Sequence, residues 1–342
     1  NHEYRRINIS RLNRVPPMEA ALSLPATLVA KLIEDAERQG MSVDEYCRAI
    51  LSESRAGDRS STRATFANEP SLDDLKLEQL SVERLSQTAV GRAFESGALS
   101  GHINRLLPLK IGCRVLWSLL SADGAGPTIR EFREEMWSRV GSLRDYLRMI
   151  DEDYARPRGD RLHASFPNSS DAAIKRFLNQ YIIRKSGLNA EQSSGAMIDF
   201  GLIGISDTGR VQFTEVGRNF SLLSNPVLDE EDHRGPSLSA DEQVLILSQI
   251  RTEMMREWKF MRHVLDGIHV GSNTPTSLLA RINRRYGPGT KADWSASVMP
   301  HMRSGVLGRM QALGLVKRTF IENRVEYRVT PLALVILEAD VV

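Results

Sequence analysis

The stretch Ser304–Arg318, SGVLGRMQALGLVKR, and its continuation Thr319–Pro331, TFIENRVEYRVTP, decide how the C-terminal part of the chain is expected to fold. Val306 and Met310 share one face of a helix with the leucine that ends it. Gly314 follows at the position where helices commonly end in a left-handed residue. An extended run, a polar turn and an alternating apolar run come next, and they predict a β-hairpin. The closing Thr-Pro pair predicts the capped start of another helix.

The same pattern occurs earlier in the chain. Gly195–Ile203, GAMIDFGLI, matches Gly308–Val316, GRMQALGLV. A turn at Asp207–Gly209 follows the first copy, and Thr214 then opens a helix as Thr330 does in the second copy. Because the glycine, the hairpin and the threonine recur in the same order, we interpret the two stretches as related modules.

Both stretches have the same order of elements: a helix, a Gly-Leu pair, a hairpin, and a helix that begins at a threonine. This order resembles the recognition helix and wing of winged-helix DNA-binding domains. The resemblance implies that the second recognition helix enters a major groove while wing cations hold phosphates. The candidate DNA contacts are His301, Arg303, Ser304 and Arg309 in or before that helix, Lys317, Arg318, Arg324 and Arg328 in the wing, and Arg281, Arg284 and Arg285 on the helix 276–286. The first copy, with its recognition helix expected over 189–200, is weakly charged, so it is expected to serve packing or a protein partner.

An N-terminal stretch carries a second resemblance. Leu22 and Leu24 alternate in a short strand, a helix follows to Gly40, and Ser42–Glu45 forms a capping box for another helix. This order resembles the ribbon-helix-helix family of MetJ, Arc and CopG type. It implies a homodimer whose paired strands face DNA, with Ser23 toward the groove. An ordinary helical hairpin after an extended segment remains the alternative.

The first residues form a basic arm that includes Arg5 and Arg6. It is interpreted either as a phosphate or minor-groove contact or as a solvated terminus.

We therefore expect a mainly α fold, with a ribbon-helix-helix-like module followed by two winged helix-turn-helix domains with short hairpin wings. The expected segments are the arm and dimerisation module at 1–53, a flexible linker at 54–70, a helical domain ending in the first winged helix at 71–225, a solvated acidic linker at 226–238, and the second winged helix at 239–342.

Several local signals within these segments make further predictions. Thr128 and the Ser239–Glu242 box are expected to cap helices, the second of which continues to Met261. Gly141 is expected to interrupt the helical pattern, and the acidic end at Asp151 is expected to fray. The basic loop 156–161 is expected to be an exposed connection, and a contact to a phosphate backbone is the alternative.

Composition restricts the function only weakly. The 342 residues are 41% hydrophobic and carry a formal net charge of +2, which argues neither for nor against nucleic acid. Cys47 and Cys113 lie far apart without neighbouring ligands, so we expect no structural zinc and a reducing compartment. No membrane-length apolar run and no signal peptide is evident, so we expect a cytoplasmic, nucleoid-associated protein without a membrane partner.

The common catalytic motifs are absent from the sequence. It contains no phosphate-binding loop, no His-Glu-x-x-His and no Gly-x-Ser-x-Gly. We expect no enzyme activity, no cofactor and no metal. The expected function is that of a dimeric, sequence-specific DNA-binding protein that regulates transcription. A protein-protein adaptor and a plasmid partition or replication initiator remain as alternatives.

Overall fold

The computed structural model describes residues 72–85, 101–184, 193–321 and 324–339. The chain divides into two compact units, Asn1–Ala67 and Asn68–Val342, and all described residues belong to the second unit. The predicted ribbon-helix-helix-like module with Ser23 therefore lies outside the described residues. The predicted basic arm with Arg5 and Arg6 also lies outside them, and both assignments stay predictions.

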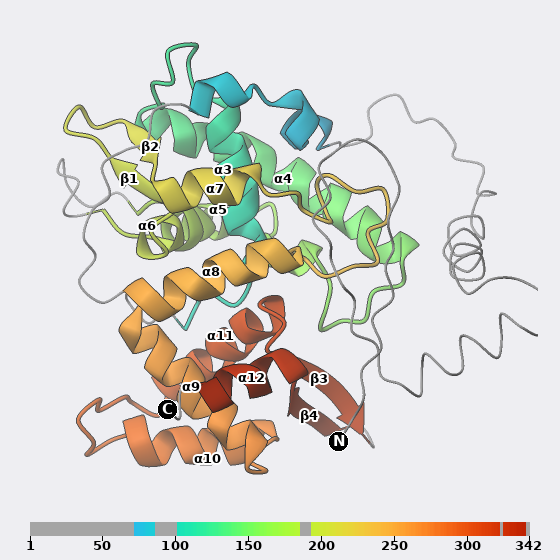
Figure 1. The fold of residues 1–342 in the computed structure, drawn as a ribbon, viewed down its shortest axis with the longest axis vertical. Helices are drawn as coiled ribbons and strands as arrows, with labels where there is room; N and C mark the ends of the chain where they lie inside the picture. The colour runs from blue at the N-terminus through green and yellow to red at the C-terminus, as the bar shows by residue number, and fades with distance from the viewer. Residues whose placement is uncertain (1–71, 86–100, 185–192, 322–323, 340–342) are drawn as a thin grey trace, which may run out of the picture. The chain divides into compact units, whose positions relative to one another are not determined.

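The first half of the described unit is mainly helical (Figure 1). Short 3-10 turns precede it at η1 (Asp73–Leu75), η2 (Leu77–Gln79) and η3 (Val82–Leu85). Its elements are α3 (Leu107–Ser118), α4 (Ile129–Asp153), η4 (His163–Ser165), α5 (Asp171–Phe177), the π-helical η5 (Leu178–Ile182), α6 (Ala196–Asp199), β1 (Ile203–Ile205), β2 (Val211–Phe213) and α7 (Glu215–Leu222). We call α3 to α7 the first repeat.

The second half begins with α8 (Ala240–Glu253), which lies between the two groups of helices in Figure 1. The elements α9 (Met255–His269), α10 (Pro275–Tyr286), α11 (Val298–Ala312), β3 (Val316–Ile321), β4 (Arg324–Val329) and α12 (Pro331–Ala339) follow it. We call α9 to α12 the second repeat. Strands β1 and β2 form one antiparallel pair and β3 and β4 another. The prediction of a mainly α chain is confirmed.

The two copies of the repeated stretch share their backbone geometry. Gly201 and Gly314 adopt φ angles of +66° and +69°, which L side chains rarely adopt. The hydroxyl of Thr214 donates to the Gly201 carbonyl at 2.5 Å, and that of Thr330 donates to the Gly314 carbonyl at 2.7 Å. In each copy the threonine thus joins the start of the last helix to the turn before the hairpin.

A further backbone contact recurs beside each hairpin. The Val211 amide donates to the Pro127 carbonyl at 2.8 Å, and the Tyr327 amide donates to the Asn273 carbonyl at 2.8 Å. Pro127 and Asn273 both lie directly before the N-cap residue of a helix, α4 and α10 respectively. The segment that enters the second long helix of each repeat therefore lies along the hairpin.

The caps predicted from local sequence are confirmed. Thr128 and Ser239 form complete capping boxes with Glu131 and Glu242. The Thr330 hydroxyl accepts from the Ala333 amide at 3.3 Å at the start of α12. Each side-chain oxygen satisfies an amide that has no partner within its own helix.

Two predictions around α4 are wrong. The helix continues through Gly141, because a single glycine costs only about 1 kcal/mol in a helix that buries an apolar face. The acidic end at Asp151 does not fray, since its carboxylate is buried. It accepts the backbone amides of Leu162 and His163 at 2.8 and 2.9 Å and thereby holds the following loop.

Two helix lengths also differ from expectation. The helix behind Ser239 does not continue to Met261, because the chain turns at Met254 and divides it into α8 and α9. Of the recognition helix expected over 189–200, the structure describes residues 193–200, in which the single turn α6 is helical, because Gly195 before it adopts φ +133°. Glu191 and Gln192 lie outside the described residues.

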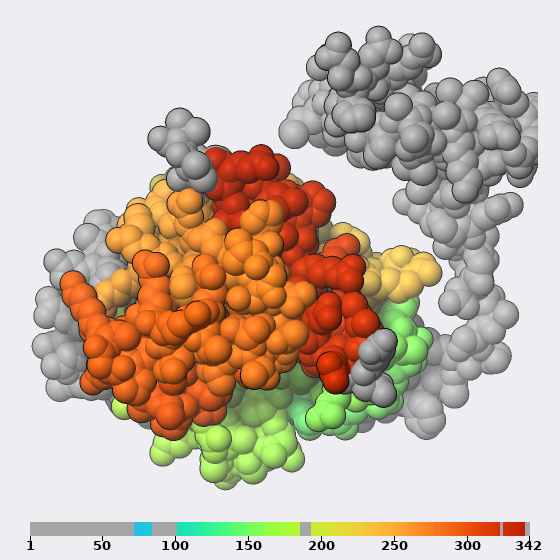
Figure 2. Space-filling view, turned by 90° about the horizontal axis from the view of Figure 1, so that it is seen from below, coloured from blue at the N-terminus to red at the C-terminus, as the bar shows by residue number. Residues whose placement is uncertain are grey.

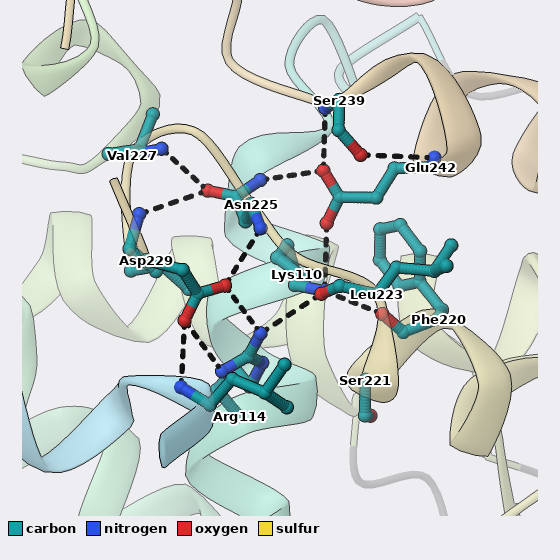
Figure 3. Close-up of polar contacts among 12 residues, drawn as sticks. Lys110, Arg114, Phe220, Ser221, Leu223, Asn225, Val227, Asp229, Ser239 and Glu242 are labelled. Carbon is teal, nitrogen blue, oxygen red and sulfur yellow. Dashed lines mark hydrogen bonds and ion pairs between the residues drawn. The ribbon is translucent and has the colours of Figure 1, made fainter. Parts of the chain in front are cut away.

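A buried ionic network joins the first repeat to α8 (Figure 3). Lys110 and Arg114 on α3 have 0% exposed side chains. The Lys110 ammonium lies 2.8 Å from the Glu242 carboxylate and donates to the Phe220 and Leu223 carbonyls at 2.6 Å each. Burial raises the pKa of Glu242 and lowers the pKa of Lys110, and each charge partly offsets the shift of the other.

The second ion pair of the network involves the segment that was expected to be a linker. Both terminal nitrogens of Arg114 contact Asp229, at 3.2 and 2.7 Å, and Asn225 donates to Glu242 at 2.8 Å. Val227 and Leu228, which lie between Asn225 and Asp229 in the sequence, are each 2% exposed. The prediction of a solvated linker at 226–238 is wrong for these residues, because paired carboxylates and apolar side chains fix the segment to α3 and α8.

We predict that Lys110→Met destabilises the chain by about 3–5 kcal/mol, because it leaves the Glu242 carboxylate buried without its partner. Urea unfolding followed by circular dichroism measures the loss. The double variant Lys110→Met with Glu242→Gln, which removes the remaining charge, should regain part of it. As control, Arg130→Met in the exposed pair with Glu134 should change stability by less than about 1 kcal/mol. Equal effects of the two single variants would contradict the role given to burial.

Candidate nucleic-acid interface

The β3–β4 hairpin carries three cations on one face. Strand register pairs Lys317 with Arg328 and Ile321 with Arg324, and directly paired residues project from the same side of a sheet. Lys317, Arg324 and Arg328 are all exposed. We call these three residues the wing face.

Few acidic side chains lie near the three cations of the wing face. On the described part of the hairpin, the carboxylate that shares this side is Glu326, opposite Thr319. Among the residues that the structure describes, Lys317, Arg324 and Arg328 have no carboxylate within 4.0 Å, the limit for an ion pair. The side therefore presents an excess of positive charge to solvent.

Arg318 does not belong to the wing face. It pairs with Tyr327 on the opposite side of the hairpin, together with Val316 and Phe320. Its guanidinium lies 4.8 Å from the centre of the exposed Phe320 ring. The prediction that grouped the four hairpin cations as one contact surface is therefore corrected, because alternate residues of a strand point to opposite sides.

Much of α11 is covered by the protein itself. A Cβ atom on Gly305 would lie 2.6 Å from the Gly101 carbonyl oxygen, and one on Gly308 would lie 2.2 Å from that of Asn104. Every residue from Gly305 to Met310 is buried. The expected recognition helix therefore offers no open ridge along its second half.

Exposed side chains of α11 lie near its first turns. His301 and Ser304 are exposed, and the His301 ring lies 5.7 Å from that of His102. Arg303 is half-buried and donates to the Pro275 carbonyl at 2.8 Å, which holds α11 against the start of α10. Of the predicted helix contacts, His301 and Ser304 therefore keep the access that a ligand needs.

The predicted contact at Arg309 is wrong. Its side chain is 1% exposed, and its Nε and Nη2 donate to one Glu257 oxygen at 2.8 and 2.6 Å. Its Nη1 donates to the Ile103 carbonyl. Arg309 therefore holds α11 to α9 and to the segment before α3, and it cannot reach a phosphate.

The cations of α10 form a separate group. Arg284 and Arg285 are exposed in the last turn, while Arg281 is half-buried against Gly267. The contact between Asn273 and Tyr327 joins the hairpin to the opposite end of α10. A helix of this length spans about 18 Å, so these arginines are not continuous with the wing face.

The hairpin of the first repeat is weakly basic. Its Arg210 donates to the Gly126 carbonyl at 2.9 Å, and Asp207 is exposed in the turn beside it. The guanidinium is thus bonded to the protein's own backbone. The prediction that this copy is poorly charged for DNA agrees with this geometry.

Two further arginines lie near the base of the second hairpin and were not among the predicted DNA contacts. Arg105 precedes α3, and Arg156 lies in the loop that was expected to be an exposed connection. The Arg156 side chain is only 9% exposed and donates to the Gly235 carbonyl at 2.9 Å. The basic composition of its loop is the local signal for Arg156, whereas no local signal marks Arg105, whose neighbours come from distant parts of the chain.

Comparison of the chain with protein-family models, with curated proteins and with solved structures found no match. Within the described ranges, no group of histidine, cysteine and acidic side chains is arranged to hold a metal ion. No helix in the same ranges combines the length and apolar character needed to cross a bilayer.

We predict that Gly308→Ala destabilises the chain by about 1–3 kcal/mol, because the new methyl group would be forced into the Asn104 backbone. Gly141→Ala is the matched control, since a Cβ there has no neighbour within 4 Å. It should stabilise α4 by about 0.5–1 kcal/mol. Denaturant midpoints of the two variants measure both effects. A neutral Gly308→Ala would mean that the segment before α3 does not press on α11.

Proposed function

We propose that the chain binds double-stranded DNA through the wing face and acts as a regulator of transcription. The observation that carries the proposal is the wing face itself, with three exposed cations on one side of a hairpin and no ion-pair partner among the described residues. Phosphate contacts by such groups supply most of the sequence-independent affinity for DNA.

The order of elements in the second repeat supports a winged-helix arrangement. The repeat begins with the helix α9, which is followed by the extended contact at Asn273. Two further helices, α10 and α11, and then the hairpin come after it. In winged-helix proteins this order places the third helix beside the wing. Under the proposal, β3 and β4 are the wing and α11 is the recognition helix.

The covered half of α11 changes the expected mode of docking. The proposal now gives base contacts only to His301 and Ser304 near the N-terminal end, which is the end that helix-turn-helix proteins direct at base edges. Arg303 and Arg309 are excluded from this role by their protein contacts. The wing therefore carries more of the affinity than the helix does.

The dimer and the N-terminal arm remain parts of the proposal. The ribbon-helix-helix resemblance supports a homodimer, and a dimer favours inverted-repeat sites because its symmetry is matched by the DNA. Arg284 and Arg285 are proposed as additional phosphate contacts.

We predict that the triple variant Lys317→Gln, Arg324→Gln and Arg328→Gln weakens binding to a mixed-sequence duplex. The slope of log affinity against log salt should fall by about 1 for each phosphate interaction that the substitutions remove. Fluorescence anisotropy over a salt series measures both quantities.

The matched control is the triple variant Lys175→Gln, Arg176→Gln and Arg184→Gln. These residues are exposed cations of the first repeat, and the substitution removes the same formal charge. The control should leave the slope nearly unchanged. Equal losses in both triple variants would show a general charge effect and would remove the wing face from the mechanism.

A protein-binding role is the second candidate, and the first repeat favours it. Trp137 on α4 is 37% exposed and borders a shallow hollow with Ile129 and Leu178. Aromatic side chains of this kind are enriched in protein interfaces. A chain without measurable affinity for duplex DNA at low salt would favour this candidate over the first.

A further inference from the structure

A hollow of about 450 Å³ lies where the base of the second hairpin meets the loop after α4. In Figure 2 the red atoms of the C-terminal region border the green atoms of that loop. The cations on its wall are Arg105, Arg156, Arg234, Lys317 and Arg318, and Asp160 is the carboxylate among them. We call this feature the arginine hollow. Its volume lies in the range of small-molecule sites.

Arg105 and Arg318 approach the hollow around Gly159. The Arg105 Nη2 donates to the Gly159 carbonyl at 2.6 Å. A Cβ on residue 159 would lie only 2.9 Å from the Arg318 Nη1, so the glycine leaves room for that guanidinium. Burial lowers the pKa of Arg105, and the like charge of Arg318 lowers it further. The two cations thus repel each other across a space that an anion would fill.

Arg156 is held in place more firmly than the other cations. Its Nη2 donates to the Gly235 and His233 carbonyls, and its Nε lies 3.8 Å from the Asp151 carboxylate. That carboxylate also accepts from the His163 ring and two backbone amides, so it is shared among several donors. The Arg156 Nε itself has no hydrogen-bond partner among the described residues.

Positive charge in the hollow exceeds the negative charge around it. Arg234 is paired with Asp232, 2.9 Å away. For Arg105, Lys317 and Arg318, the described part of the chain provides no carboxylate within 4.0 Å. Asp160 acts on Arg105 only through the longer-range field. Folding therefore gathers these cations without supplying them with anions.

We infer that the arginine hollow binds a phosphate group, either a phosphodiester or a phosphoanhydride. Guanidinium groups present forked donors that match phosphate oxygens, and they do so best where water is partly excluded. Arg105 and Arg318 supply the facing donors, and Lys317 adds a point charge at the rim.

The inference does not rest on DNA binding by the wing face, because the two facing donors, Arg105 and Arg318, do not belong to that face. Lys317 is the one residue that belongs to both the wing face and the hollow. Two sources of the same chemistry are compatible with it. One is the backbone of a nucleic acid, and the other is a small phosphorylated compound in solution.

Calorimetric titration of the full chain with inorganic pyrophosphate tests the site. We expect saturable single-site binding at constant ionic strength. Arg318→Gln should weaken it by about tenfold or more, the effect of losing a charge-assisted hydrogen bond. Arg324→Gln removes the same charge from the other side of the hairpin and should change the affinity by less than about twofold, as expected for a distant, screened charge.

Gly159→Ala is a second variant that leaves the charge unchanged. Its methyl group would displace the Arg318 guanidinium, whose flexible end can move without disturbing the backbone. Pyrophosphate binding should weaken while the unfolding transition stays in place. Binding that is not saturable, equal weakening by Arg318→Gln and Arg324→Gln, or full affinity in Gly159→Ala would overturn the site.

Competition with a mixed-sequence duplex distinguishes the two sources. If a nucleic-acid backbone occupies the hollow, the duplex displaces pyrophosphate and Arg318→Gln also loses duplex affinity. If a soluble compound occupies it, the chain binds pyrophosphate and duplex together. Both results support the site. The double variant Arg324→Gln with Arg328→Gln leaves Arg105, Lys317 and Arg318 in place, so it should keep its pyrophosphate affinity even if the DNA proposal fails.

Discussion

The pairing of Lys110 with Glu242 and of Arg114 with Asp229 is the constraint on which the described unit depends. Two cations on one helix are fully buried, and an uncompensated buried charge is strongly destabilising. Their carboxylates come from α8 and from the segment before it. The energetic need to pair these charges therefore makes the connection between the repeats part of the core, and both repeats belong to one compact unit.

Features that depend on neighbouring residues could be predicted from the sequence. The caps at Thr128 and Ser239 and the left-handed glycines at 201 and 314 follow from local hydrogen bonding and backbone sterics. The hairpins and the repeat were predictable for the same reason. Strand alternation could also have separated Arg318 from Lys317, because neighbouring strand residues always point to opposite sides.

Features that depend on distant partners could not be predicted in this way. The position of Arg309 in its helix is typical of a solvent-facing residue. Its burial depends on Glu257 and the Ile103 carbonyl, which come from distant parts of the chain. Asp229 likewise stands in an acidic run that is typical of a linker, and only Arg114 makes it a core residue. The cations of the second hairpin were found from sequence, but the arginine hollow could not be, because it depends on the position of the loop after α4 beside Arg318.

The contact of Arg309 with Ile103 spans 206 positions of the chain. During synthesis, the segment before α3 therefore leaves the ribosome long before α11 exists to cover it. The cations of α3 gain their partners earlier, when Asp229 and Glu242 have been made, so the first repeat cannot reach its final packing before the start of α8 is present. Closure of the unit therefore follows the synthesis of α11, and a chain interrupted before Asp229 would keep the charges of Lys110 and Arg114 hydrated where its interior should be.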